Sequence, residues 1–357
     1  MKRDCTRRNF LKLGGIAGAS LLFPMSTNMA RAAEKSQLNV YSWYTQLIKE
    51  YMSLYSKETG TETNLIGSYG GNPIWWTKMM AGETWDFFIP SMDWLQRAAK
   101  AGMIEPLNIT KIPNYENLSE EGKRITKEQL SFDGKIYAIP FTLVVNALVW
   151  NTNKVSQTPT SWSALWDKQY KDRISMKDEP QLAVMVAALL TGQNPNDIKD
   201  WEAVKKALEN QRELVKKYWN THDEIFEMLA TEQVWLSQYN DGRIRELISK
   251  KIPLNYTVPK EGAPSTIDCL AIPKSAKNKE EAHKFINFIL KPENIALQMK
   301  SYNYLSFVPA AENFVSEELK KSHQIPKDWF GRLVWRSFTP PETQKQMDSV
   351  WMEVKMK

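Results

Sequence analysis

Residues 38–43, Leu-Asn-Val-Tyr-Ser-Trp, open the stretch of sequence that decides the fold. This β-rich run precedes residues 45–57, where apolar side chains recur with the spacing of one helix face. The alternation continues with a predicted strand at residues 61–66, a helix at 72–81 and a buried strand at 85–90. Ser91 stands where it could cap the next helix, which Gly102 would end. Repeated strand–loop–helix units predict an α/β fold with a mainly parallel sheet flanked by helices.

An apolar stretch at residues 136–150 is too short to span a bilayer and too rich in β-forming residues for a surface helix. We interpret it as strands that cross between two lobes. Other predicted elements are helices at residues 162–165, 182–190, 201–217, 282–289 and 342–357 and a strand at 267–272. Ligands of open parallel sheets bind beyond the carboxyl ends of the strands. The predicted cleft therefore lies at the loops after Trp43, Pro90 and Ser175 and around Asp268.

The first 32 residues predict an export signal. A basic start is followed by an apolar run at residues 13–23 and by Ala-Arg-Ala at 30–32, a pattern typical of signal-peptide cleavage. The run is shorter than the roughly 20 residues of a spanning helix. Arg7 and Arg8, within residues 6–12, resemble the twin-arginine signal; an ordinary secretory signal is the alternative. We expect cleavage near Ala32 and a soluble periplasmic protein.

Composition narrows the classes of function. The chain has 357 residues, of which 42% are hydrophobic and 25% charged, as in ordinary globular proteins. The leader carries six of the 47 basic and one of the 41 acidic residues, which leaves a net charge of +1 on the mature chain. A nucleic-acid partner is not expected, because phosphate binding needs a basic surface. Cys269 remains as a lone thiol, expected to be buried. Motifs for metals, nucleotides and serine hydrolases do not occur, so we predict neither cofactor nor enzyme.

Sequence blocks along nearly the whole mature chain carry a family resemblance. They read Tyr-Ser-Trp at residues 41–43, Lys-Glu-Thr-Gly at 57–60, Trp-Asp at 85–86, Ile-Pro-Ser at 89–91, Thr-Ser-Trp-Ser-Ala-Leu-Trp at 160–166 and Tyr-Lys at 170–171. The most specific block reads Val-Pro-Lys-Glu-Gly at 258–262, Asp at 268, Leu-Ala-Ile-Pro at 270–273, Ala-Lys-Asn-Lys at 276–279 and Ile-Asn-Phe-Ile-Leu at 286–290. In these blocks the chain resembles the periplasmic polyamine-binding proteins, the spermidine and putrescine receptors of bacterial ABC importers.

The resemblance implies a two-lobe periplasmic-binding-protein fold of type II that closes on a ligand in its cleft. One lobe would comprise residues 37–144 and 266–312, and the other residues 145–265 and 313–357. Hinge closure would be absorbed by a few connecting residues. The implied partners are a small amine and a membrane permease with a cytoplasmic ATPase, and the receptor is expected to be a monomer.

The resemblance also implies a set of ligand-binding residues. A polyamine cage needs aromatic faces and carboxylates. Trp43, Asp268 and Tyr304 stand where the family has a cage tryptophan, an ammonium-binding aspartate and a cage tyrosine. The full set of candidates is Trp43, Ser91, Asp93, Glu179, Asn240, Asp241, Asp268 and Tyr304. The chain departs from the pattern where Asp93 replaces an aromatic residue, Leu182 replaces an acid, and Asn240 and Thr266 replace tryptophans.

These departures leave several functions open. The first hypothesis is a receptor for a small organic cation such as putrescine or spermidine. The second is a receptor of the same fold for a sugar-like or zwitterionic solute, favoured by the missing tryptophans. Ferric-iron binding is disfavoured because the chain has no Tyr-Tyr pair. An exported enzyme is disfavoured because no nucleophile–base or metal constellation is recognisable.

Overall fold

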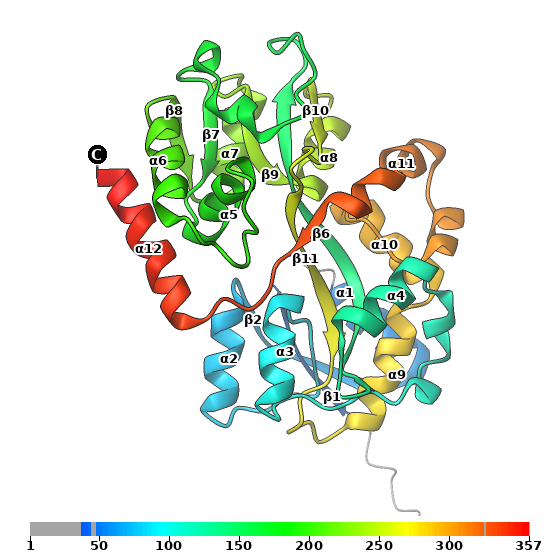
Figure 1. Ribbon diagram of the computed structural model, residues 1–357. Helices are drawn as coiled ribbons and strands as arrows, with labels where there is room; N and C mark the ends of the chain where they lie inside the picture. Colours follow the sequence, from blue (N-terminus) through cyan, green and yellow to red (C-terminus); the bar gives the residue numbers. More distant parts are fainter. Residues whose placement is uncertain (1–36, 44–47, 325, 357) are drawn as a thin grey trace, which may run out of the picture. The chain divides into compact units, whose positions relative to one another are not determined.

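The computed structural model describes residues 37–43, 48–324 and 326–356, which belong to one compact unit. The predicted export signal and its cleavage site at Ala32 lie outside the described residues. Figure 1 shows two groups of helices and strands that are joined by long strands running between them. We call the group in the lower half of the view the first lobe and the group in the upper half the second lobe.

The first lobe contains the amino-terminal strands and the helices beside them (Figure 1). Its strands are β1 (Gln37–Trp43), β2 (Glu62–Tyr69) and β3 (Phe87–Phe88), with a separate hairpin of β4 (Ser131–Phe132) and β5 (Lys135–Ile136). Its helices are α1 (Ile48–Thr59), α2 (Asn72–Met80), α3 (Met92–Lys100), α4 (Glu120–Gln129) and α9 (Lys279–Ile289). Because β1 pairs in parallel with both β2 and β3, the predicted strand–loop–helix alternation of this region is confirmed.

The second lobe is built around a second set of parallel strands. Its strands are β7 (Ile174–Lys177), β8 (Val215–Trp219), β9 (Leu236–Asn240) and β10 (Leu254–Thr257). Its helices are α5 (Pro180–Leu190), α6 (Trp201–Arg212), α7 (His222–Ala230), α8 (Asp241–Ser249) and α12 (Pro341–Met356). The strand β7 pairs in parallel with β8 and β9. The helix α12 packs against α5 and α6, as predicted for a carboxyl-terminal packing helix.

Two long strands connect the lobes. They are β6 (Ala138–Asn151) and β11 (Ala263–Ala271), which pair antiparallel. The hydrogen-bonded path runs β2-β1-β3-β11-β6-β9-β7-β8, so the two expected sheets form one ten-stranded sheet. The remaining elements are β12 (Leu333–Trp335), α10 (Pro292–Tyr302) and α11 (Glu317–Ser322). The predicted crossing at residues 136–150 is thus confirmed, and its near-continuous burial explains its apolar sequence.

Short 3-10 helices complete the chain. They are η1 (Ile109–Lys111), η2 (Pro113–Asn117), η3 (Trp162–Trp166), η4 (Lys168–Tyr170), η5 (Pro309–Phe314) and η6 (Lys327–Arg332). The predicted helix at residues 162–165 is one of these 3-10 turns rather than an α-helix.

Two predicted elements have different bounds in the structure. The helix predicted at residues 201–217 ends at Arg212, because residues 215–219 add to the edge of the sheet beside β7. The strand predicted at residues 85–90 is reduced to β3. The Asp86 carboxylate accepts hydrogen bonds from the backbone N–H groups of Asn39, Lys277 and Asn278, and so fixes the chain before the strand begins.

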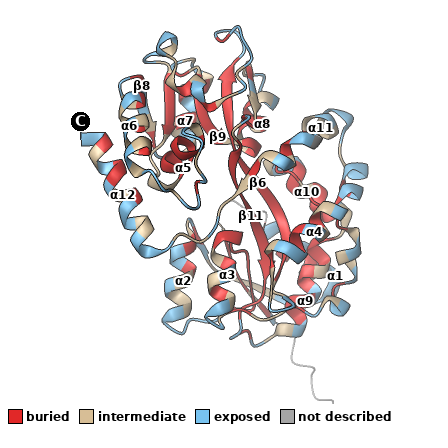
Figure 2. Cartoon of the chain, in the orientation of Figure 1, coloured by how far each residue is buried: buried red, intermediate tan, exposed pale blue. Residues whose placement is uncertain are grey.

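Buried side chains line both faces of the sheet in each lobe. Figure 2 shows β6, β11 and the inner side of α5 as buried, whereas the outer sides of α6 and α12 are exposed. Cys269 lies in β11 and is fully buried, as expected. No helix of the described residues is long and apolar enough to cross a membrane.

After the expected third boundary between the lobes, at residues 312 and 313, the chain returns to the sheet and then leads to α12. The segment between β12 and α12 runs from the sheet toward the far side of the second lobe (Figure 1). Its strand β12 pairs in parallel with Ala263–Ser265 of β11. Gly262 allows this approach: its φ is +99°, and a Cβ there would lie 2.7 Å from a Val334 methyl group. Because L side chains rarely adopt this φ, the position favours glycine.

Candidate ligand-binding site

A cavity of about 660 Å³ collects the loops that the sequence marked as a cleft. Its lining comes from both lobes, from β6 and β11, and from the segment before α12. The lining residues are Trp43, Gly70, Gly71, Asn72, Pro73, Ser91, Asp93, Trp94, Arg97, Val144, Asn146, Lys177, Glu179, Pro180, Gln181, Leu182, His222, Asn240, Thr266, Asp268, Tyr304, Arg336, Phe338, Thr339, Pro341 and Gln344. The volume suits a small solute.

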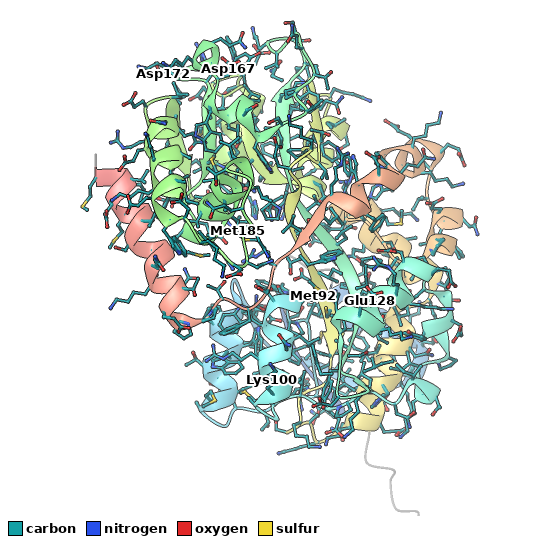
Figure 3. All side chains as sticks on the ribbon, viewed as in Figure 1. Met92, Lys100, Glu128, Asp167, Asp172 and Met185 are labelled. Carbon is teal, nitrogen blue, oxygen red and sulfur yellow. The ribbon has the colours of Figure 1, made fainter. Side chains whose placement is uncertain are left out.

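The first lobe directs the amino-terminal end of α3 at this cavity. Figure 3 labels Met92 and Lys100 at the two ends of α3, with Met92 at the end toward the second lobe and Lys100 at the end away from it. The Asn72 side chain orients this end, because its Oδ1 accepts a hydrogen bond of 3.1 Å from the Ser91 backbone N–H. Ser91 and Asp93 therefore enter the lining from one helical turn.

Ser91 does not cap α3 through its side chain. It occupies the N-cap position, but within the described part of the chain its hydroxyl makes no hydrogen bond to the helix. It instead donates to Asp268 Oδ1 at 2.8 Å, across 177 residues of sequence. Ser91 thus has the predicted N-cap position but not the side-chain cap, because its hydroxyl is turned toward the Asp268 carboxylate instead of toward the N–H groups of the helix.

The Asp268 carboxylate lies in β11 beside a break in the ladder. The register between β11 and β6 shifts between Asp268 and Cys269, where Pro140 of β6 has no N–H to offer. Bulges of this kind redirect a side chain. Asp268 is only 9% exposed, and burial raises its pKa to about 7, with a smaller upward contribution from Asp93. The Ser91 hydroxyl and the charge of Arg336 oppose that rise.

Trp43 ends β1 and provides an aromatic wall. Its ring centroid lies 4.7 Å from that of Tyr69, whose hydroxyl donates to the Ile89 carbonyl at 2.5 Å. The Trp43 Nε1–H is buried and has no hydrogen-bond partner among the residues described. Trp43 thus has the position at a strand's carboxyl end that the sequence predicted.

A second carboxylate of the cavity, Asp93, lies between a neutral and a charged partner. Its Oδ1 accepts a 3.3 Å hydrogen bond from the Thr266 hydroxyl, and its Oδ2 lies 3.7 Å from Arg336 Nη2. Burial raises the pKa of Asp93, and the Arg336 charge counteracts the rise.

The third carboxylate, Glu179, comes from the second lobe at the start of α5. Its Oε2 forms an ion pair of 2.6 Å with Lys177, and its Oε1 lies 3.7 Å from Arg336 Nη2. Burial favours the protonated acid, but the nearby charges of Lys177 and Arg336 outweigh it and lower the pKa of Glu179.

Neutral groups complete the lining. Asn240 ends β9 and Tyr304 follows α10, and the structure brings both to the cavity. The Tyr304 ring packs so closely on Gly242 that a Cβ there would lie 2.6 Å from the ring. His222 also lines the cavity. Burial, followed by the charges of Arg243 and Lys177, lowers its pKa to about 4, so it is neutral near pH 7.

Asp241 is the one candidate that the structure places elsewhere. It is fully buried and does not belong to the described lining of the cavity. Its Oδ2 pairs with Arg245 at 2.8 Å, and its Oδ1 accepts a 2.9 Å hydrogen bond from the Val145 backbone N–H. Both carboxylate oxygens are therefore engaged inside the protein, and we leave Asp241 out of the proposed site.

Several lining residues were missed by the sequence analysis. Trp94 and Phe338 form an edge-on aromatic pair with ring centroids 5.7 Å apart. They replace part of the aromatic surface that the chain lacks where the family has tryptophans. Arg336 and His222 were also missed. Trp94 adjoins Asp93 on α3 and could have been found from that position. Arg336 and Phe338 lie outside any motif, so no local signal pointed to them.

The described residues do not form a metal-binding cluster. No group of three or more His, Cys, Asp or Glu side chains among them is arranged to hold a metal ion. The lining instead combines ionised or ionisable carboxylates, aromatic faces and amide groups, which suits the recognition of a polar organic solute.

The fold and the cavity together define a class, the two-lobe receptors that hold a small solute between their lobes. The chain belongs to the family of bacterial extracellular solute-binding proteins, which matches residues 50–327. A putrescine-binding periplasmic protein of Pseudomonas aeruginosa, SpuD, is 27% identical over 349 residues, covering 92% of this chain and 94% of the relative. The putrescine-binding periplasmic protein PotF of Escherichia coli is 25% identical over 363 residues, covering 96% of each.

A solved structure supports the same fold. The spermidine/putrescine ABC transporter substrate-binding protein PotD of Streptococcus pneumoniae superposes with a TM-score of 0.79. The alignment covers 90% of this chain and 99% of PotD, at 23% sequence identity. The predicted two-lobe fold of periplasmic binding proteins is therefore confirmed.

Proposed function

We propose that this protein is the substrate-binding component of an ABC importer and delivers a small organic cation to a membrane permease that works with a cytoplasmic ATPase. Polyamines such as putrescine and spermidine are the first candidates, because the relatives that span nearly all of this chain are named for them. We also propose a periplasmic location after cleavage near Ala32. The names of the relatives describe binding proteins, which favours a carrier over an enzyme.

The observation that carries this proposal is the Asp268 carboxylate. It lies in a cavity of solute size and hydrogen-bonds the neutral Ser91 hydroxyl. No ion pair of Asp268 with a basic side chain occurs in the described residues. A buried carboxylate without a counterion is unfavourable, and a ligand ammonium would supply the missing charge. Trp43 would supply a face for the ammonium or for the methylene chain.

We propose the lobe boundaries given by the sequence, with residues 37–144 and 266–312 in one lobe and residues 145–265 and 313–357 in the other. Support comes from β6, which pairs with β11 up to Val145 and with β9 from Asn146 onward. It also comes from α12, which packs on α5 and α6 of the second lobe.

The experiment is calorimetric titration of putrescine, spermidine and a panel of uncharged and zwitterionic solutes. We expect Asp268→Asn to weaken amine binding by about 30-fold or more, because losing one partner of a desolvated charged pair costs about 2–5 kcal/mol. Asp197→Asn, at an exposed ion pair with Lys199, is the matched control and should bind normally. Tight binding of an uncharged solute that is indifferent to Asp268→Asn would contradict the proposal.

A second candidate function has one observation in its favour. Basic side chains line the cavity together with the acidic ones, and a dication would meet them. This feature favours a zwitterionic amine over a polyamine, in the same fold and the same site.

A further inference from the structure

Arg336 reaches into the cavity from the segment between β12 and α12. Its backbone N–H donates to the Ser265 carbonyl at 2.9 Å, which anchors the residue to β11. Its side chain is 16% exposed and hydrogen-bonds Gln181 at the start of α5. Gln181 in turn donates to the Thr339 hydroxyl at 2.7 Å, so the second lobe holds this segment on both sides of Phe338.

The guanidinium of Arg336 stands between acids from different lobes. Its Nη2 lies 3.7 Å from Asp93 Oδ2 on α3 and 3.7 Å from Glu179 Oε1 at the start of α5. Its Nε–H is buried and lacks a hydrogen-bond partner among the residues that the structure describes. The arginine thus offsets the charge of one acid from each lobe.

The charges of the lining are nearly balanced without a ligand. Its acidic side chains are Asp93, Glu179 and Asp268, and its basic side chains are Arg97, Lys177 and Arg336. The Arg97 guanidinium lies 4.1 Å from the ring centroid of Trp76 and 4.6 Å from that of Phe338. Lys177 pairs with Glu179, and Arg336 lies beside Asp93.

Asp268 is therefore the carboxylate that remains for a ligand cation. Its partner Ser91 is neutral, whereas Asp93 and Glu179 each have a basic neighbour. A diamine would place its second ammonium near Arg336 and Lys177, whose like charges repel it in a poorly hydrated space. The acids at that end, Asp93 and Glu179, are already engaged by these two cations. A carboxylate at that end would instead meet the fork of donors that Arg336 offers.

We propose that Arg336 sets the charge of the ligand: the site takes a short amino carboxylate, with its ammonium at Asp268 and its carboxylate at Arg336. This inference rests on the part of the proposed function in which Asp268 binds an ammonium, and it favours the zwitterionic second candidate over the polyamines. His222 also lines the cavity and is neutral near pH 7, and the charge of Lys177 acts on it.

The test uses two probes that differ at one end. Putrescine and 4-aminobutyrate have chains of the same length and share one ammonium group, but the second end is an ammonium in the first and a carboxylate in the second. Both are titrated by calorimetry into wild-type protein. We expect 4-aminobutyrate to bind more tightly than putrescine.

The Arg336→Gln variant removes the positive charge and most of the N–H donors of the guanidinium. The ratio of the two dissociation constants should shift toward putrescine by about 30-fold or more, the size of effect seen when one partner of a buried charged pair is removed. Arg336→Lys keeps the positive charge but loses the paired N–H donors of the guanidinium. This variant should therefore still bind putrescine poorly, and it should bind 4-aminobutyrate more weakly than the wild type does. Arg332→Gln, which removes a charge paired with Asp328 outside the cavity lining, should leave the ratio unchanged.

The outcomes separate the two proposals. Tighter binding of putrescine to wild type, or an unchanged ratio in a folded Arg336→Gln protein, would overturn the inference and leave the amine receptor standing. Binding of neither probe, nor of any other amine, would overturn the proposed function itself. Circular dichroism spectra of each variant establish that the protein is folded. If Arg336→Gln does not fold, the ratio of the dissociation constants for putrescine and 4-aminobutyrate is measured on Arg336→Lys.

Discussion

Single residues of the cavity owe their properties to what surrounds them. Burial raises the pKa of both Asp268 and Asp93, but Arg336 is the main influence opposing the rise at Asp93 and only a minor one at Asp268. The difference comes from their neighbours: Asp268 has a hydroxyl 2.8 Å away, and Asp93 has a guanidinium at 3.7 Å. Because Asp268 is buried without an ion-pair partner among the described residues, its pKa should respond most strongly to a bound cation.

Ligand binding should depend on pH because of Asp268. Burial raises its pKa from 3.8 to about 7, and an ammonium ligand pairs only with the ionised form. Amine affinity should therefore fall as the pH drops from 8 to 5, and binding near pH 7 should release about half a proton, the share bound when pH equals pKa. Calorimetry in buffers of different ionisation enthalpy measures this release. Constant affinity over this pH range would show that Asp268 is not the partner of the ligand.

The same shift affects the stability of the unliganded protein. The folded state keeps the Asp268 proton between about pH 4 and pH 7, where the unfolded chain has lost it. Asp268 therefore contributes stability at the acidic end of this range, and the contribution is lost as the pH rises through 7. Thermal unfolding of Asp268→Asn should lack this component of the pH dependence.

At the scale of elements, the exchange of partners along β6 is the decisive feature. Val145 pairs with Ser265 of β11, and Asn146 pairs with Asn240 of β9. The Val145 N–H is satisfied by Asp241 Oδ1 from the start of α8. Arg245 holds Asp241 in place and also donates to the Asn303 carbonyl and the Tyr256 hydroxyl. One buried ion pair thus ties α8 to the crossing and to the end of α10.

Arg245→Met should destabilise the protein strongly. The variant leaves Asp241 buried without its cation, and breaking a buried pair by removing one partner costs about 3–5 kcal/mol. Urea denaturation followed by tryptophan fluorescence measures the loss in free energy of unfolding.

Arg124→Met is the matched control for Arg245→Met. Arg124 pairs with Glu121 and Glu128 on the exposed side of α4, where an ion pair contributes about 1 kcal/mol or less. Equal losses for the two variants would contradict the structural role of the buried pair.

At the scale of the whole molecule, three segments run between the lobes. Two are the strands β6 and β11, and the third passes the proposed boundary at residues 312 and 313, ahead of the segment that carries Arg336 (Figure 1). Few connecting residues allow two lobes to rotate about a hinge. Because the cavity takes side chains from both lobes, a ligand that contacts both should favour their closure.

Closure should be visible in solution. Adding the true ligand should lower the radius of gyration measured by small-angle X-ray scattering and change the tryptophan emission, to which Trp43 contributes from the cavity wall. Trp43→Ala is the control for the optical signal, since it should keep the scattering change and lose part of the emission change. Tight binding without a change in scattering would count against closure.

Export is a further property of the whole molecule. Replacing Arg7 and Arg8 with lysine should leave unprocessed precursor in the cytoplasm, because the twin-arginine pathway requires the pair. Immunoblotting of cytoplasmic and periplasmic fractions distinguishes precursor from the mature chain. Normal processing of the double variant would indicate an ordinary secretory signal.

The amino-acid sequence was enough to predict the fold class and the region of the site. Local periodicity predicted the alternation from β1 to α3, because the apolar face of a helix or strand recurs within a few residues. The rule for strand carboxyl ends then placed Trp43 and Asp268 in one cleft, and the structure brings both to the same cavity. The family resemblance supplied Tyr304 and Glu179, which line it too.

Only the tertiary structure decided which of these groups are available to a ligand. Asp241 forms a buried ion pair with Arg245 and is not available to a ligand. The Ser91 hydroxyl donates to Asp268, which is 177 residues away in sequence. Residues 215–217 became an edge strand because β7 offered unpaired backbone groups. Arg336 enters the site from the segment between β12 and α12, which pairs with β11 through β12. Periodicity records the burial of a residue, but the pairing of charges depends on contacts between distant segments, and no local pattern encodes those contacts.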